Sequence, residues 1–478
     1  MAEEMGLTVR KDENFSEWYT QVVQKAGLIE YSDVSGCYVL RPRSFAMWEK
    51  IQKYFDDKIK AKGVENAYFP LFIPESLLVK EADHVEGFTA EVAWVTHSGN
   101  TKLNERLAVR PTSETIMYPA YAKWIRSHRD LPLRLNQWCN VVRWEFNNPM
   151  PFLRSREFLW QEGHTAFASK KEADEEVLDI LDLYKEVFED LCAVPVMKGQ
   201  KSEKEKFAGA DYTTSVETFL PIHKAIQCAT SHGLGQNFAK AFDVNFLDEE
   251  GKKNYVWQNS WGLSTRAIGI MLIMHGDDKG LVLPPKLAPL QIVIVPILFE
   301  KTKKDVLKSC DSLSKKIGKK FSVYIDDREE HKPGFKFNEW ELKGVPLRIE
   351  LGPKDLEKEQ VVITRRDTGK KEFVKITDVT KRVEGLLEEI QNDLLNKARK
   401  QMNDSLVEVK NYTEFKKAIK EGKFVKAAWC GSVESEEKIK DENTGAKSLN
   451  FPYEFKETGK CIITGEMNCK YAIFAKSY

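Results

Sequence analysis

Hydrophobic positions in the first part of the chain follow helical and strand spacing in turn. Residues 44–62 place apolar side chains three or four apart, which predicts a long amphipathic helix, and residues 172–191 predict a second one. The apolar run 67–72 predicts a strand interrupted by Pro70. Prolines at 284, 285 and 289 then indicate a domain boundary.

Beyond this boundary, short apolar segments alternate with amphipathic ones. The predicted strands are 291–296, 321–326, 346–351 and 360–363, and the predicted helices are 303–317 and 335–342. Such alternation is typical of a compact α/β domain with a largely parallel sheet. A helix from 379 to about 396 follows. At 478 residues the chain is too long for one core, and we expect domains at 1–287, 288–385 and 386–478.

Composition narrows the class of protein. The chain has 73 Lys and Arg residues against 73 Asp and Glu, so its zero net charge neither supports nor excludes a nucleic-acid partner. No apolar run approaches the roughly 20 residues that cross a bilayer, and the N-terminus lacks a signal pattern. We therefore expect a cytoplasmic protein that does not bind a membrane. The eight cysteines are scattered without a regular framework, which suggests that they are reduced thiols.

A short charged segment is the first candidate for chemistry. Alternation from Val142 to Phe146 predicts a strand, and residues 147–151 turn the chain back, so we expect a hairpin that carries Arg143, Arg154 and Phe158. Guanidinium groups bind phosphate oxygens and a ring face suits a base, as a nucleotide triphosphate requires. The alternative, an exposed strand with solvated ion pairs, is about equally favoured by this segment alone.

Two further segments suggest parts of the same site. In Arg110–Glu114, Thr112 and Glu114 suit a cationic amine, although a helix start capped by Thr112 or Ser113 is locally the better interpretation. Residues 262–269 open an apolar helix and place Arg266 in its first turn. Because the dipole there is positive, a bound anion explains this arginine better than a structural ion pair does.

Together these segments resemble the class II aminoacyl-tRNA synthetases, with motif 1 at 68–70, motif 2 at 143–145 and motif 3 at 262–266. Residues 110–114, 160–164, 205–212 and 230–232 are similar to those of the prolyl-tRNA synthetases of eukaryotic and archaeal type. The resemblance covers essentially the whole chain. It implies an α+β catalytic domain with an antiparallel class II sheet, an α/β anticodon-binding domain, and a small α/β C-terminal domain that ends near the active site.

The resemblance also implies the site. Expected to bind proline are Thr112, Glu114, Arg143, Trp160, His164, Phe207, His232 and Phe88, the last on a loop that closes over the amino acid. Expected to bind ATP with Mg²⁺ are Arg143, Arg154, Phe158, Gln227, Thr230 and Arg266. Arg143 is the expected catalytic residue, since it touches both substrates. The implied reaction forms prolyl-adenylate and transfers proline to tRNA(Pro).

Metal sites are not expected. His164 and His232 suggest zinc, but histidines flanked by aromatic residues more often pack or hydrogen bond. This argues against the threonine-specific relatives, which use zinc to bind a hydroxyl group. Many relatives also hold a structural zinc with four cysteines. Here Cys430 and Cys461 are present, Ser435 and Ile463 replace the other two ligands, and the spacing of Cys469 makes it a poor substitute.

The remaining expectations concern partners. Glu341, Arg348 and Lys354 would read the guanines of a proline anticodon, although spacing alone favours a solvated charged strand. The resemblance implies a homodimer with motif 1 at its interface. No editing domain fits between the hairpin and Gly262. Two rivals remain: a paralogue that binds tRNA without catalysis, which retention of every phosphate and amine ligand disfavours, and a ligase that forms adenylates without tRNA.

Overall fold

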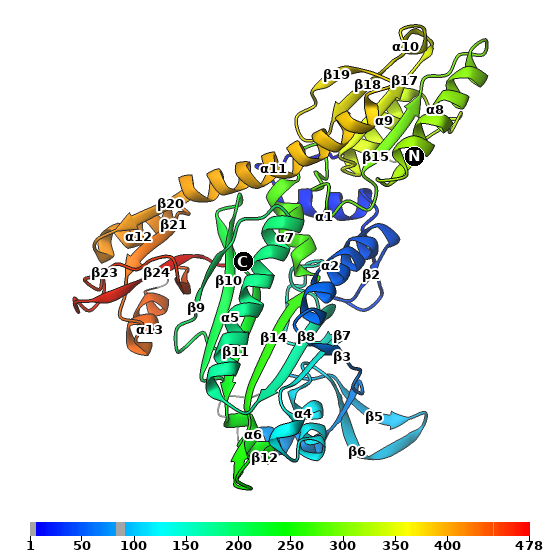
Figure 1. The fold of residues 1–478 in the computed structure, drawn as a ribbon. Coiled ribbons are helices and arrows are strands. Elements are labelled where there is room, and N and C mark those ends of the chain that lie inside the picture. Colours follow the sequence, from blue (N-terminus) through cyan, green and yellow to red (C-terminus); the bar gives the residue numbers. More distant parts are fainter. Residues whose placement is uncertain (1–5, 83–90, 443) are drawn as a thin grey trace.

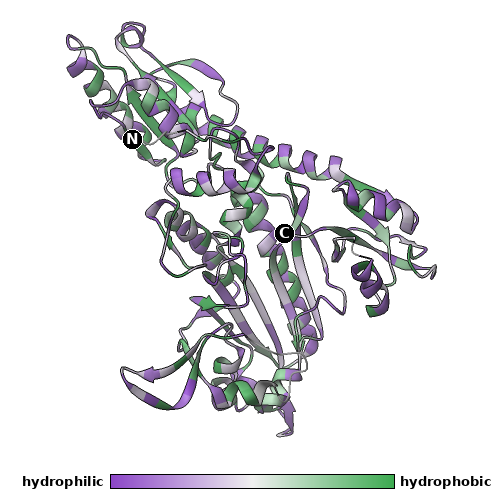
Figure 2. Cartoon of the chain, turned by 180° about the vertical axis from the view of Figure 1, so that it is seen from behind, coloured by the Kyte–Doolittle hydropathy of each residue, from purple (hydrophilic) through white to green (hydrophobic). Residues whose placement is uncertain are grey.

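The computed structural model describes residues 6–82, 91–442 and 444–478. Three regions are arranged around one long helix, α11 (Val379–Ser405), which runs from a five-stranded sheet to the C-terminal region (Figure 1). It extends well beyond the predicted end at 396. Hydrophilic and hydrophobic positions alternate along it in Figure 2, because one face packs on the neighbouring regions. None of the helices within the described ranges has the length and apolar character that a membrane crossing needs.

The first region is built on an antiparallel sheet, which confirms the expected class. In spatial order its strands are β9 (Met197–Gln200), β10 (Tyr212–Leu220), β11 (Lys224–Gly235), β14 (Trp257–Ser264), β8 (Glu157–Phe167), β7 (Leu133–Val142) and β3 (Glu65–Asn66). Only the short β3 pairs in parallel. The main helices packed on this sheet are α1 (Phe15–Lys25), α2 (Pro42–Lys60), α5 (Lys170–Glu186) and α7 (Arg266–His275).

Smaller elements extend from this region. They are β1 (Ile29–Tyr31), β2 (Tyr38–Leu40), β4 (Phe72–Pro74), α3 (Glu75–Ala82), β5 (Trp94–Ser98), β6 (Thr101–Val109), α4 (Glu114–Trp124), α6 (Asn237–Phe242), β12 (Asn245–Leu247) and β13 (Lys253–Tyr255), with single turns at His128–Asp130 and Val187–Leu191. Between the hairpin and Gly262, all the residues belong to these core elements and their connections. No domain is inserted in this stretch.

Two predicted strands are wrong in their bounds. The segment 67–71 is extended without being a strand: Pro70 has no N–H, and the main-chain groups beside it bond to Gln137 and Arg110. The predicted strand 142–146 ends at Val142, and the alternating charges beyond it lie in the loop of the hairpin. The hairpin itself is confirmed, since β7 and β8 pair in antiparallel register.

The second region is a five-stranded sheet of mixed direction. Its strands are, in spatial order, β16 (Val323–Ile325), β15 (Ile292–Pro296), β17 (Leu347–Leu351), β18 (Gln360–Arg365) and β19 (Lys371–Lys375), with helices α8 (Lys303–Ile317), α9 (Pro333–Leu342) and α10 (Pro353–Glu357). Only β15 pairs in parallel, with β16 and β17. The predicted largely parallel sheet is wrong, because β18 runs antiparallel to β17 and the tight turn through Gly369 makes β18 and β19 a hairpin.

The third region continues the first sheet. It contains β20 (Leu406–Val409), α12 (Tyr412–Lys420), β21 (Phe424–Ala428), α13 (Val433–Asp441), β22 (Ala446–Pro452), β23 (Thr458–Gly459) and β24 (Cys469–Lys476). Strand β22 pairs with β9, which joins the two sheets edge to edge. The chain then returns to the hairpin: the Tyr478 N–H donates to the Ala225 carbonyl at 3.0 Å, and the Tyr478 hydroxyl contacts Met150.

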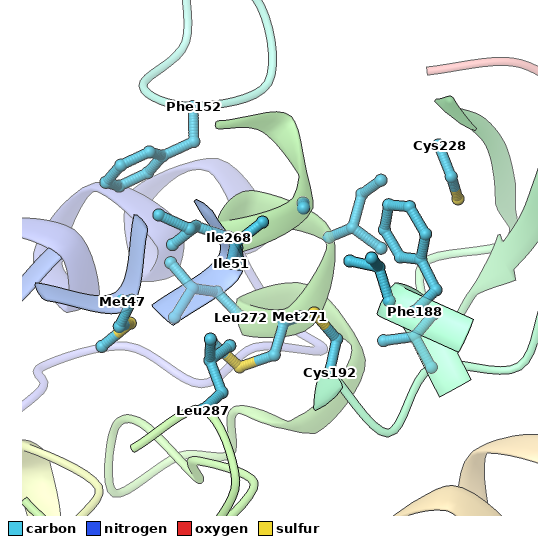
Figure 3. Packing of buried hydrophobic residues seen from close by; sticks show 14 of the residues in the cluster. Met47, Ile51, Phe152, Phe188, Cys192, Cys228, Ile268, Met271, Leu272 and Leu287 are labelled. Carbon is cyan, nitrogen blue, oxygen red and sulfur yellow. The ribbon is translucent and has the colours of Figure 1, made fainter. Parts of the chain in front are cut away.

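Helix α7 lies at the centre of the main core. Every residue from Ala267 to Met274 is buried. Ile268, Met271 and Leu272 pack among side chains of α2, the hairpin loop and the segment that follows α7 (Figure 3). Burial of each large apolar side chain contributes about 1.5–3 kcal/mol, so the position of α7 is strongly fixed.

Candidate active site

Most of the predicted site residues meet in one cavity of about 280 Å³ on the large sheet. Those that line it are Thr112, Glu114, Arg143, Phe158, Trp160, His164, Phe207, Gln227, Thr230, His232 and Arg266. They come from β8, from β11, from the first residues of α4 and α7, and from the connections beside these elements. Segments far apart in the sequence therefore form a single site.

Of the predicted proline- and ATP-binding residues that the structure describes, Arg154 does not line the cavity. Arg154 lies in the hairpin loop, and its charge reaches Arg266. Phe88 lies outside the described residues.

The hairpin places Arg143 at the edge of the cavity. Its N–H donates to the Arg156 carbonyl at 2.7 Å, which extends the β7–β8 ladder by one bond. Its guanidinium donates to the Pro111 carbonyl at 3.2 Å and lies 5.3 Å from the ring centre of Trp160. Burial lowers the pKa of Arg143, but an arginine remains a cation in this setting.

Arg266 begins α7, as predicted. Its Nε donates to the Leu153 carbonyl at 3.2 Å and its Nη1 to the Gln227 carbonyl at 3.4 Å. Burial lowers its pKa, and repulsion from Arg143 and Arg154 adds to that effect.

No carboxylate of the described residues lies within 4.0 Å of Arg143, Arg154, Arg156 or Arg266. Arg154 is exposed, but Arg143, Arg156 and Arg266 are partly buried, and partly buried cations without a carboxylate are unfavourable unless an anion joins them. This end of the cavity is therefore suited to a polyanion.

The opposite end of the cavity is acidic and already hydrogen bonded. The Thr112 hydroxyl donates to Glu114, and the Ser113 hydroxyl donates to Glu162. Helix α4 begins at Glu114, but Ser113 makes no capping bond to it. The predicted helix start is confirmed, with Ser113 as the residue before it, but the predicted capping bond is not formed: the hydroxyls of Thr112 and Ser113 donate to carboxylates of the cavity instead.

Glu162 is a site residue that sequence reasoning missed. It accepts hydrogen bonds from the Ser113 N–H at 3.2 Å, from Gln137 at 3.0 Å and from His164 at 3.1 Å. Burial would raise its pKa, but the hydrogen bonds from His164, Ser113 and Gln137 outweigh burial and lower it. One signal was available: Glu162 is a charged residue in the middle of a buried strand.

His164 has both ring nitrogens occupied. Nε2 faces Glu162 and Nδ1 lies 3.0 Å from the Tyr118 hydroxyl. Burial lowers its pKa, but Glu162 and Glu114 together raise the pKa above its ordinary value. Ligand atoms of Glu114, Glu162 and His164 lie within 4.8 Å of one another, a spacing that also fits a metal. The hydrogen bonds account for the cluster without one.

His232 has the opposite character. Burial and the charges of His164, Lys201 and Arg143 lower its pKa to about 3, so the ring is neutral. Its Nδ1 lies 2.9 Å from the hydroxyl of Thr213, which also accepts from the Phe207 N–H at 2.8 Å. The rings of Phe207 and His232 are 4.9 Å apart. These uncharged rings form an apolar wall, and Thr213, which sequence reasoning also missed, holds it in place.

The packing of β8 against β14 requires glycine at position 163, within the 160–164 segment. A Cβ atom there would lie 2.1 Å from the ring of Trp261, which lines the same cavity. Only glycine therefore permits β8 and β14 to pack in this register.

The predicted anticodon residues are only partly grouped. Arg348 lies 3.4 Å from Glu341 and 3.0 Å from Glu350, and its guanidinium covers the Phe337 ring at 4.1 Å. Lys371, which sequence reasoning missed, lies 3.2 Å from Glu350 on the next strand but one. Lys354 is in α10, beyond the far end of β17, and no described contact joins it to this group.

The C-terminal cysteines do not form a thiolate set for zinc. The Ser435 hydroxyl, 3.5 Å from Cys430 Sγ, already accepts from the Trp429 indole at 2.7 Å. Burial raises the pKa of Cys430, but hydrogen bonds from Ser435 and Ser432 lower it to about 7. A hydroxyl is a poor zinc ligand compared with a thiolate, so the donor set does not fit a structural zinc.

Comparisons with known proteins agree with this geometry. The model of the class II tRNA synthetase core domain (G, H, P, S and T) matches residues 94–275. The anticodon-binding domain model matches 291–386, and the model of the C-terminal region of prolyl-tRNA synthetase matches 412–478.

Individual relatives match along the whole chain. A cytoplasmic proline–tRNA ligase of Arabidopsis thaliana is 52% identical, over 99% of this chain and 91% of the relative. Proline–tRNA ligase 2 of Bacillus cereus is 50% identical over the full length of both. The crystal structure of prolyl-tRNA synthetase from Cryptosporidium parvum, complexed with halofuginone and AMPPNP, superimposes with a TM-score of 0.95 at 50% identity, over 99% of this chain and 100% of that one. The chain belongs to the prolyl-tRNA synthetases, the proline–tRNA ligases of class II.

Proposed function

We propose that the cavity is where this proline–tRNA ligase joins the carboxylate of L-proline to the α-phosphate of ATP. The observation that carries the proposal is that one cavity holds an organised acidic end, at Thr112 and Glu114, and a cationic end whose arginines have no carboxylate partner. A zwitterionic amino acid and a nucleotide triphosphate together supply the charges that both ends lack.

The residues act by position and charge. Thr112 and Glu114 bind the imino nitrogen, which directs the proline carboxylate toward Arg143. A carboxylate oxygen forms a bond to the α-phosphorus as the bond to pyrophosphate breaks, and Arg143 stabilises the charge on both substrates. In the second step a ribose hydroxyl at the 3′ end of tRNA(Pro) attacks the prolyl carbonyl, and AMP leaves. No side chain has to act as a nucleophile.

The nucleotide occupies the cationic end. Phe158 and Arg266 enclose adenine, Arg154 holds the outer phosphates, and Gln227 and Thr230 contact the nucleotide. The side-chain oxygens of Gln227 and Thr230 are hard donors of the type that Mg²⁺ accepts, so they fit an ion that arrives with ATP. When bound, Mg²⁺ neutralises charge on the phosphates.

The apolar wall selects the pyrrolidine ring. Trp160, Phe207 and the neutral His232 offer ring faces, and His164 is occupied by Glu162. The wall presents mainly ring faces, so a side chain with a hydroxyl group would lose more of its bonds to water there than an apolar ring does. Phe88 would close over the bound proline.

The chain divides by function at the predicted bounds. Residues 1–287 catalyse, residues 288–385 bind the anticodon, and residues 386–478 form the C-terminal domain that brings Tyr478 to the hairpin. Glu341 and Arg348 read the anticodon, with the partly exposed Glu341 at the edge of the paired group and Lys354 on the adjoining helix. Arginine donors match the acceptors of guanine, which supports this role for Arg348.

We also propose a cytoplasmic homodimer without structural zinc. Exposed aromatic side chains surround motif 1, with Tyr68 73%, Phe72 45% and Trp124 51% exposed, as expected where a second copy packs. Light scattering should report twice the chain mass. Metal analysis of the purified protein should find no tightly held zinc, and one zinc per chain would refute that part of the proposal.

Amino-acid-dependent ATP–pyrophosphate exchange tests the central proposal. Proline should support exchange, and alanine and cysteine should support it far less well. Equal rates with alanine or cysteine would refute the pocket assignment. Binding of tRNA(Pro) without any exchange would instead support the non-catalytic paralogue.

A further inference from the structure

A bidentate salt bridge joins the catalytic region to the anticodon-binding sheet. Helix α7 ends at His275, and Asp277 lies two residues beyond that end. Arg366, which follows β18, donates from Nη1 to Asp277 Oδ2 at 2.8 Å and from Nη2 to Oδ1 at 2.6 Å. The Arg366 side chain is only 4% exposed. Bidentate pairs of this kind fix orientation as well as distance.

The same arginine also contacts the proposed anticodon reader. Its Nε donates to the main-chain carbonyl of Glu341 at 2.7 Å. The Glu341 carboxylate lies 3.4 Å from Arg348 on its own sheet and 3.5 Å from Lys279 of the catalytic region. A base that donates hydrogen bonds to the Glu341 carboxylate must therefore compete with one cation from each region.

The interface between the two regions is closely packed, so that the end of α9 and the segment after α7 cannot move independently. The Leu281 N–H donates to the Leu342 carbonyl at 3.0 Å, at the end of α9. At Gly280 a Cβ atom would lie 2.6 Å from the same carbonyl, and at Gly344 one would lie 2.5 Å from Leu281. A shift at the end of α9 is consequently passed on rather than absorbed.

Helix α7 can carry such a shift into the cavity. Lys11 Nζ holds its C-terminal end through the carbonyls of Ile273, at 2.5 Å, and Gly276, at 2.8 Å. At the other end Gly269 lies against the hairpin loop, where a Cβ atom would be 2.7 Å from Leu153. Between these ends the helix is packed on all sides (Figure 3). It therefore moves as one body with Arg266 at its first position.

We propose that the Arg366–Asp277 pair couples anticodon capture at Glu341 and Arg348 to the seating of α7, and so of Arg266, in the active site. The proposal rests on the anticodon role given above. Base capture draws the Glu341 carboxylate away from Arg348 and Lys279, and this change of contacts is the difference between the free and bound states that coupling requires. Arg366 and Asp277 are thus positioning residues, which act through α7.

Asp277→Asn and Arg366→Lys test the coupling. The neighbouring Arg365→Lys is the matched control, since Arg365 pairs with Asp367 and Asp393 and with no residue of the catalytic region. Each enzyme is assayed for charging of tRNA(Pro) and of a transcript with one anticodon guanine replaced, and for ATP–pyrophosphate exchange without tRNA. Thermal unfolding checks that each variant folds. If Arg366→Lys does not fold, Asp277→Asn alone tests the coupling.

In both test variants, the preference for tRNA(Pro) over the transcript with the replaced guanine should fall at least tenfold from the wild-type value. The loss should come from a lower kcat with tRNA(Pro), while its KM stays within threefold and exchange without tRNA stays within twofold. The double variant should be no worse than either single one, as expected for two residues that act as a unit. Arg365→Lys should keep the full preference.

Arg348→Ala separates the two proposals. If Arg348→Ala keeps the anticodon preference, the anticodon role is wrong and the coupling falls with it. If Arg348→Ala loses the preference while Asp277→Asn and Arg366→Lys keep it, the anticodon role stands and the coupling is refuted. A drop in exchange without tRNA equal to the drop in charging would also refute the coupling, because it would show a general defect of the active site.

Discussion

Arginines at the active site and arginines of the anticodon-binding region differ in their partners. Arg143, Arg154, Arg156 and Arg266 have no carboxylate of the described residues within 4.0 Å. In residues 288–385 the arginines are all paired with carboxylates; they are Arg328, Arg348, Arg365, Arg366 and Arg382.

The difference shows two uses of the same side chain. Unpaired cations that are partly buried, as Arg143 and Arg266 are, cost stability, which supports the proposal that they are kept for an anion from outside the chain. Paired arginines hold elements together, or, at Arg348 and Arg366, hold residues that can exchange partners. The predictions below address this contrast.

Arg143→Ala should have the largest effect. Removing the cation proposed to contact both substrates should lower proline-dependent ATP–pyrophosphate exchange on the order of a thousandfold, as loss of a donor to a transition-state charge does elsewhere. Arg382→Ala, which removes an arginine paired with Glu372 at 2.7 Å, is the control and should exchange at the wild-type rate. Equal losses in both variants would remove the distinction between the two sets of arginines.

Glu114→Gln should raise the KM for proline. Loss of a buried carboxylate that faces a cation costs about 2 kcal/mol or more, which corresponds to about 30-fold in affinity. The KM for ATP should stay within twofold, because the nucleotide occupies the other end. An equal rise in both KM values would show that the two ends are not separate.

Glu162→Gln should destabilise the fold in a pH-dependent way. The pKa of Glu162 is lower in the folded chain, so its carboxylate contributes stability above the unfolded value of about 4.3 and loses it as pH falls through the folded pKa. Unfolding experiments should show a deficit of about 3 kcal/mol for the variant at pH 7, shrinking below about pH 4. A deficit that did not change with pH would contradict the ionised state of Glu162.

His164 contributes with the opposite sign. The pKa of His164 is raised on folding. Its contribution to the free energy of unfolding is therefore fully present below the unfolded pKa of about 6.5 and is lost as pH rises through the folded pKa. The Glu162–His164 pair is therefore complete between about pH 4.3 and 6.5. In Glu162→Gln this alkaline loss should largely disappear from the pH profile of unfolding.

Arg382→Ala should have the smallest effect. Arg382 is partly exposed and pairs with Glu372 and Glu389, each at 2.7 Å. Such pairs are worth up to about 1 kcal/mol, so the free energy of unfolding should fall by no more than that. High salt should reduce the difference from wild type further.

The residues that line the cavity could be predicted from the sequence more readily than the residues that hold them in place. Arg143, Thr112, Glu114 and Arg266 stand in segments whose residue types already suggest a ligand. Glu162, Thr213 and Lys371 could not be assigned in the same way, because their roles depend on cross-strand neighbours far away in the sequence. Helix positions were close for a similar reason: the spacing of an apolar face is local information.

Strand bounds and sheet direction were less predictable. The alternation at 142–146 has the period of a strand, but the chain there forms the loop that carries Arg143 into the cavity. The direction of β18 and β19 depends on one short turn rather than on the apolar pattern of either strand. Sequence reasoning could not assign a role to Glu145, and in the structure it is an exposed loop residue whose charge reaches Arg143.

Thermal unfolding of Arg266→Met, with and without Mg²⁺ and ATP, tests most directly the claim that the cavity arginines are kept for a nucleotide. Arg266 is partly buried and is repelled by Arg143 and Arg154. Without nucleotide the variant should therefore unfold at or above the wild-type temperature, and ATP should stabilise only the wild type. A variant that unfolds earlier without nucleotide and keeps the full stabilisation by ATP would contradict the account.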